Sequence, residues 1–173
     1  MYIARKLRQS HVTAYVLYMY QVEDIIRAYG LDLDRICNQY LPRFNYTKEQ
    51  QAEVGEWYAN LIGMMRDENI QERGHLQVVR NTVLLLADRH QELLQDPKQS
   101  FYNAAYFKAL PCIVGLRAHG ASREVHEIEN CLDAIGYDEK KEEFTDYSQF
   151  VFYEGKVNVG SVALDDYFVK GGA

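Results

Sequence analysis

Cysteine and proline are scarce in this sequence, and nothing in it indicates a disulfide framework. The three cysteines, Cys37, Cys112 and Cys131, lie far apart and form no C-x-x-C pair, which also argues against a zinc knuckle. A chain of 173 residues buries roughly two-thirds of its unfolded surface on folding, so it needs no metal or disulfide for stability. We therefore expect no cofactor and a reducing, cytoplasmic location.

An excess of positive charge is also missing. Lys and Arg total 19 against 25 Asp and Glu, which gives a formal net charge of -6, and the basic residues are scattered among the acidic ones. The electrostatic field that would attract a nucleic-acid backbone is therefore absent. We predict that the protein has no nucleic-acid partner.

Long apolar runs are the third absence. No stretch approaches the ~20 apolar residues that cross a bilayer. Arg5, Lys6 and Arg8 precede a mostly apolar run from Val12 to Tyr20, as in a secretory signal, but this run contains Thr13 and three tyrosines and continues directly into a helical pattern. We predict that the protein has no membrane partner.

Apolar residues recur at spacings of three and four through most of the first 135 residues, which is typical of α-helices with one buried face. Six helical segments are predicted in this way, beginning near Ser10, Asp32, Thr47, His75, Asp96 and Ser122. Short connections between amphipathic helices favour antiparallel neighbours. The predicted fold is therefore all-α, an up-and-down antiparallel helical bundle of five to six helices.

Local signals refine the helix ends. Residues 47–50, Thr-Lys-Glu-Gln, have the pattern of a capping box, in which the Thr and Gln side chains bind free amides of the first turn. Asp96-Pro97 predicts an N-cap followed by proline at the first helical position. Pro111 lies within the helix that follows, and its ring predicts a kink or break near Leu110.

The composition changes after Gly136, so we predict a bundle domain over residues 1–136 and a tail over residues 137–173. The tail begins with a charge run, DEKKEE, that is typical of a solvated helix end or linker, and continues with β-branched and aromatic residues. Gly155-Lys156 fits a two-residue hairpin turn. An extended arm and partial disorder are the alternatives for this tail.

His90 occupies the position that the buried stripe of its helix needs between Leu86 and Leu93. An unpaired polar group in a core costs on the order of 1 to 3 kcal/mol, so a histidine at such a position usually has hydrogen-bond partners. The chain has 14 tyrosines, and those at positions 15, 29 and 58 fall on inward stripes of other helices. A tyrosine–histidine hydrogen bond in the core is the favoured interpretation.

Other polar residues offer weaker indications of chemistry. Glu72 and His75 have the E-x-x-H spacing of di-iron bundles, but those sites need two such motifs and two further glutamates. Beside another apolar stripe, Glu23 has the spacing of a helical ion pair with Arg27. No nucleophile elbow or phosphate-binding glycine loop is present. The alternative prediction is a small-molecule- or metal-binding bundle that uses Glu72, His75 and possibly His90.

The aromatic residues of the tail favour an interaction function. Tyrosine and tryptophan are enriched in interface anchors, and an uncovered aromatic tail would leave an exposed apolar patch. We predict a non-catalytic interaction module, a homo-oligomer or the partner of another protein. The residues predicted to make this contact are Tyr147, Phe150, Phe152, Tyr153, Tyr167 and Phe168.

Four stretches carry a resemblance to a known family: AYVLYMYQVEDIIRAYGLDLDRI, WYANLIGMM, ERGHLQ and ALPCIVGLR. Together they resemble a bacterial family of helical proteins described only as a domain of unknown function, over roughly residues 1 to 135. The resemblance implies an all-helical bacterial cytoplasmic protein. It attaches no catalytic role to any residue.

Overall fold

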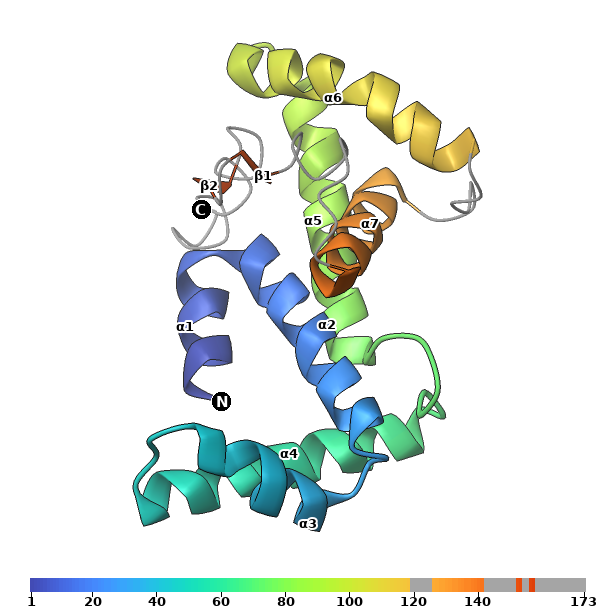
Figure 1. Cartoon of the computed structure of the whole chain (residues 1–173). Helices are drawn as coiled ribbons and strands as arrows, with labels where there is room; N and C mark the ends of the chain where they lie inside the picture. The colour runs from blue at the N-terminus through green and yellow to red at the C-terminus, as the bar shows by residue number, and fades with distance from the viewer. Residues whose placement is uncertain (119–125, 142–151, 154–155, 158–173) are drawn as a thin grey trace.

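A computed structural model describes residues 1–118, 126–141, 152–153 and 156–157 of the chain (Figure 1). The prediction of an all-α protein is confirmed, with seven α-helices in these residues. The helices are α1 (Tyr2–Ser10), α2 (Val12–Ala28), α3 (Leu33–Arg35), α4 (Lys48–Asp67), α5 (Gln77–Gln95), α6 (Ser100–Ala118) and α7 (Glu127–Lys141). A π-helical turn (Ile36–Tyr40) and a 3-10 turn (Leu41–Arg43) follow α3.

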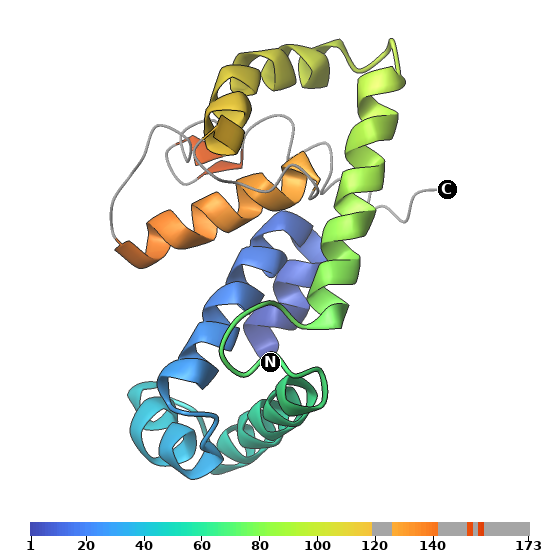
Figure 2. The same ribbon diagram turned by 90° about the vertical axis from the view of Figure 1, so that its right-hand side faces the viewer.

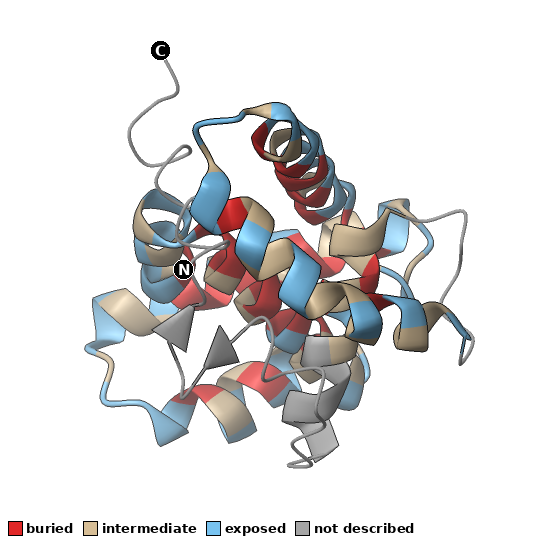
Figure 3. Cartoon of the chain, turned by 90° about the horizontal axis from the view of Figure 1, so that it is seen from above, coloured by how far each residue is buried: buried red, intermediate tan, exposed pale blue. Residues whose placement is uncertain are grey.

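Helix α2 is the centre of the fold. It packs against α1, α4, α5 and α7, and buried residues lie along the inward faces of these helices (Figure 3). Val16, Val22 and Ile26 of α2 are among the most completely buried side chains. The three-four spacing of apolar residues that predicted this helix thus forms the main contact surface of the core.

The N-terminal helix α1 was not predicted. Ser10 was expected to cap the first helix, but it is the last residue of α1 and its hydroxyl donates to the Lys6 carbonyl. His11 separates the two helices, and α2 begins at Val12. Ala4 and Leu7 are the apolar residues of α1 that pack in the core, so its apolar stripe is too short to be recognised in the sequence.

Predicted helix ends agree with the structure where a side chain supplies the cap. Thr47 and Gln50 form the predicted capping box of α4, and Asp32 accepts a hydrogen bond from the Arg35 amide of α3. The prediction for Asp96 was wrong: its amide donates to the Glu92 carbonyl at the end of α5, and its side chain accepts from the Lys98 amide. A turn therefore delays the start of α6 to Ser100.

Two helices cross the others steeply. In Figures 1 and 2, α4 passes beneath α2 and α6 lies across the end of α5. Helix α6 keeps Pro111 in its interior, and its ribbon bends along its length (Figure 2), as the proline predicted. Among the described helices, none combines the length and the apolar character needed to span a membrane.

The C-terminal part of the described chain contains one helix and two short strands. Helix α7 continues past residue 136 to Lys141. Strands β1 (Phe152–Tyr153) and β2 (Lys156–Val157) pair antiparallel, and Lys156 lies opposite Tyr153. Lys156 therefore belongs to a strand rather than to the predicted turn, and Gly155 lies outside the described residues. Residues 147, 150, 167 and 168 of the predicted contact lie outside the described residues.

Candidate functional site

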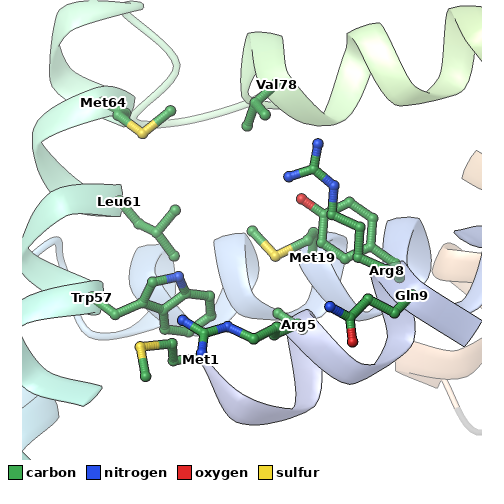
Figure 4. Close-up of a pocket in the computed structure, with 11 residues that line it drawn as sticks. Met1, Arg5, Arg8, Gln9, Met19, Trp57, Leu61, Met64 and Val78 are labelled. Carbon is green, nitrogen blue, oxygen red and sulfur yellow. The ribbon is translucent and has the colours of Figure 1, made fainter. Parts of the chain in front are cut away.

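A groove lies between α1, α2, α4 and the first turn of α5 (Figure 4). Its volume is about 830 Å³. The apolar part of its lining comes from four segments of the chain and consists of Met1, Ala4, Met19, Trp57, Leu61, Met64 and Val78. Met19 and Leu61 are buried, whereas Trp57 and Met64 are half-buried. The groove therefore presents an apolar floor to solvent.

Arginines supply the charge of the groove. Arg5 and Arg8 are exposed residues of α1, three positions apart, so both lie on the same face of that helix. Figure 4 shows Arg5 extending toward Trp57 and Arg8 extending into the space between α1 and α5. The guanidinium carbon of Arg8 lies 5.9 Å from the centre of the Tyr15 ring, within the range of a cation–π contact.

The remaining polar groups add no carboxylate to the lining. Tyr15 and Gln9 complete it. Burial, together with the positive charge of Arg5, lowers the pKa of the Met1 amine to about 6. Outside the lining, the Tyr2 hydroxyl donates to Glu53 of α4 and holds α1 against that helix. The groove thus combines apolar surface with positive charge, an arrangement that suits an apolar ligand carrying a carboxylate.

A second polar cluster surrounds His75, in the connection between α4 and α5. Nδ1 of His75 lies 2.6 Å from Oε2 of Glu23, a fully buried residue of α2. The other oxygen of Glu23 accepts the Leu76 amide at 3.0 Å, at the start of α5, where the helix dipole favours negative charge. Glu23 therefore attaches the beginning of α5 to the central helix.

Tyr20 and Asp133 complete this cluster. The Tyr20 ring stacks on His75 with 3.6 Å between ring centres. Burial raises the pKa of Tyr20, and the nearby carboxylates of Asp133, Glu129 and Glu23 raise it further. The Tyr20 hydroxyl hydrogen-bonds Asp133, whose Oδ1 lies 3.8 Å from Nε2 of His75. The cluster thus joins α2, α7 and the α4–α5 connection.

Arg27 strengthens the same connection. Its guanidinium donates to the carbonyls of Ile70 and Gly74 and pairs with Asp24 at 3.1 Å. The predicted pairing of Arg27 with Glu23 was therefore wrong, because Glu23 turns into the core toward His75. Arg27 thus pairs with Asp24, three positions before it, instead of with Glu23, four positions before it.

His90 lies at the meeting point of α5, α6 and α7 and is 2% exposed. Its Nδ1 is 2.5 Å from the Tyr102 hydroxyl and its Nε2 is 2.6 Å from Oε1 of Glu127. Tyr106 also donates to Glu127. Burial lowers the pKa of His90, against the opposing effect of Glu127. If the His90 ring is neutral, donates from Nε2 to Glu127 and accepts at Nδ1 from the Tyr102 hydroxyl, all three side chains have hydrogen-bond partners.

The predicted tyrosine–histidine hydrogen bond in the core is thus confirmed, with Tyr102 as the partner in place of the tyrosines at 15, 29 and 58. The helix that carries Tyr102 was predicted, but its inward face was not evident. The apolar residues of α6 are distributed around the helix, so its sequence shows no preferred stripe.

The residues of the metal-binding alternative lie apart. Glu72 is exposed in the α4–α5 connection rather than on a helix, and His75 binds Glu23 instead. His90 is fifteen residues further along, about 20 Å away at the rise of an α-helix. No three His, Cys, Asp or Glu side chains in the described part of the chain are grouped so that they could hold a metal ion. Elemental analysis remains the direct test of this prediction.

Sequence reasoning missed the groove and the role of Glu23. Arg5 and Arg8 were considered only as part of a possible targeting signal, and Trp57 only as part of the family resemblance. The sequence contains one indication of the role of Glu23, which is that this residue borders an apolar stripe. Its partner His75 lies 52 residues away and could not be identified.

Comparison with known proteins agrees with the resemblance seen in the sequence. Residues 1–138 match the family described as "Domain of unknown function (DUF4924)". No curated protein and no solved structure matches the chain.

Proposed function

The chain belongs to the DUF4924 family, a domain of unknown function, and we propose that it is a non-catalytic interaction module whose groove binds an acidic, aromatic segment of a polypeptide. The observation that carries this proposal is the lining of the groove. Apolar side chains form its floor, and Arg5 and Arg8 provide charge on one side. Aromatic anchors on an apolar floor and carboxylates beside arginines are the contacts that such a lining favours.

The polar clusters support a structural role for the histidines rather than catalysis. His90 uses both ring nitrogens for contacts within the core, and Nδ1 of His75 is held by Glu23. Both sets of contacts join separate helices. The groove combines apolar surface, positive charge and access from solvent.

Trp57 makes the proposal directly testable, because it is the single tryptophan of the chain and lines the groove. We expect a short synthetic peptide, with two aspartates before two aromatic residues, to shift Trp57 fluorescence in a saturable way. The matched control peptide replaces both aspartates by asparagine. Arg5→Gln and Arg8→Gln should weaken binding of the acidic peptide, whereas Lys6→Gln, on the same helix but outside the groove, should not. Equal binding of both peptides would contradict the proposal.

Self-association is one form of this function, since each copy carries an aromatic and acidic C-terminal segment. A second copy of the chain is then a partner of the same chemistry. Light scattering over a range of protein concentrations tests this form. A mass that rises with concentration, and no longer rises in Arg5→Gln/Arg8→Gln, would support it.

A second candidate function is the binding of a small amphipathic carboxylic acid. The volume of the groove, about 830 Å³, falls within the range of small-molecule sites, roughly 300–1,000 Å³. This version places the small-molecule site in the groove rather than at Glu72, His75 and His90. Titration with decanoate, followed by Trp57 fluorescence, tests it. Saturable binding of decanoate without binding of the acidic peptide would favour this second candidate.

A further inference from the structure

The C-terminal residues have the chemistry that the groove favours. Residues 142–173 contain seven aromatic residues and carry six acidic against two basic residues, a net charge of -4. Within them, residues 164–168 read Leu-Asp-Asp-Tyr-Phe. This stretch places a pair of carboxylates directly before a pair of aromatic rings.

The two surfaces are complementary in charge and in apolar character. Asp165 and Asp166 provide two negative charges for Arg5 and Arg8, which are separated by one helical turn. Charge-assisted hydrogen bonds between guanidinium and carboxylate are stronger than those between neutral groups. The aromatic rings that follow match the exposed part of the apolar floor at Trp57 and Met64. The segment thus has an acidic pair next to an aromatic pair, and the groove has two arginines next to an apolar floor.

We propose that residues 164–168 of the chain occupy the groove of their own molecule. This inference rests on the proposed function and names the resident ligand of the same site. The segment begins 23 residues after the end of α7, and strands β1 and β2 pair antiparallel within this connection. With these strands folded back on each other, the connection spans up to about 60 Å. A folded chain of this size is roughly 40 Å across, so the connection is longer than the molecule is wide.

Mass action favours the contact within one molecule. A tethered segment whose connection can span the distance to its site has an effective concentration on the order of millimolar, far above the micromolar concentration of a second copy in ordinary solutions. The tethered segment therefore competes with every external partner of the groove. A partner must displace it, and two copies associate through this contact only by exchanging their segments.

The first experiment uses the full chain and Trp57 fluorescence. Replacing both aromatic residues, in Tyr167→Ala/Phe168→Ala, should expose Trp57, with a red shift of its emission and stronger quenching by acrylamide. Asp165→Asn/Asp166→Asn should act in the same direction. The matched control is Tyr147→Ala/Phe150→Ala, which removes two aromatic residues from another part of the tail and should leave Trp57 unchanged. Far-ultraviolet circular dichroism verifies that each variant is folded.

The second experiment separates this inference from the proposed function. A synthetic peptide with the sequence of residues 161–173 is added to the full-length protein and to Tyr167→Ala/Phe168→Ala. We expect at least roughly tenfold tighter binding to the variant, because its tethered competitor is weakened. Equal binding to both proteins would overturn the resident segment while leaving the groove as a peptide site. No binding to either protein would contradict both proposals.

Light scattering distinguishes a contact within one molecule from a contact between two copies. If the wild-type protein keeps a monomeric mass while Trp57 stays protected at every protein concentration, the contact lies within one molecule. Protection of Trp57 that appears only as the mass doubles would show exchange between copies and would overturn the intramolecular contact. Unchanged Trp57 fluorescence in both tail variants would remove residues 164–168 as the occupant.

Discussion

The carboxylate of Glu23 on α2 lies 2.6 Å from Nδ1 of His75, 52 residues further along the chain. Glu23 is fully buried, whereas the side chain of His75 is 26% exposed. The pair therefore links the centre of the core to the edge of the α4–α5 connection. Because its second oxygen accepts the Leu76 amide, a single buried side chain positions the start of α5.

Glu23→Ala should destabilise the protein by about 2 to 4 kcal/mol, since it leaves the Leu76 amide and His75 without their buried acceptor. Glu23→Gln keeps an acceptor for the amide and should cost less. Urea unfolding followed by circular dichroism measures both. The control is Glu72→Ala, an exposed acid in the same connection, which should change the unfolding free energy by less than roughly 0.5 kcal/mol. A similar loss in the control would assign the effect to the connection as a whole.

His90→Leu should cost about 2 to 4 kcal/mol, because it removes the partner of both the Tyr102 hydroxyl and the Glu127 carboxylate in the core. Tyr102→Phe removes one hydrogen bond and should cost about 1 kcal/mol. Chemical denaturation measures both losses. If His90 served a ligand instead, His90→Leu would leave the unfolding free energy nearly unchanged.

Burial of His90 predicts a loss of stability in acid. Because its pKa in the folded protein lies below its ordinary value of 6.5, the unfolded chain takes up the proton first as the pH falls. The contribution of this residue is therefore complete above pH 6.5 and decreases as the pH drops from there toward the folded pKa. Unfolding free energies measured from roughly pH 8 to roughly pH 5, which covers about 1.5 pH units on either side of the ordinary histidine pKa, should show this decrease. In His90→Gln the decrease should be smaller.

Thr47→Ala should cost about 1 kcal/mol, because it removes the side-chain acceptor of the Gln50 amide at the start of α4. Ser10→Ala is the matched control, since the Ser10 hydroxyl bonds a carbonyl at the end of α1 and caps no helix start. Thermal unfolding of both variants tests this difference. A larger loss from Ser10→Ala would mean that the end of α1 matters more than the capping box.

The sequence was informative wherever local chemistry decides the structure. The capping residues Thr47 and Asp32 act within one helical turn, so their role is visible in a few consecutive letters. The same holds for the bend of α6, which contains Pro111, and for the three-four spacing of the buried residues of α5. Local chemistry misled at Asp96-Pro97, because a turn and a helix start share the same residue preferences.

The candidate site was less predictable because its residues come from distant parts of the chain. The groove needs α1 to lie against α4, and α1 has only two apolar residues that pack in the core. The tyrosine that binds His90 could not be chosen from the sequence, because α6 shows no preferred apolar face.

By itself, the sequence determined that this chain is helical, that its helices share one apolar core, and that His90 has hydrogen-bond partners there. Periodicity and capping act between neighbours, and those are physical rules that a sequence displays. Only the tertiary structure decided that Glu23 binds His75, that Tyr102 binds His90, and that Arg5, Arg8 and Trp57 line one groove. These contacts depend on the angles at which helices cross, and many side chains acting together set those angles.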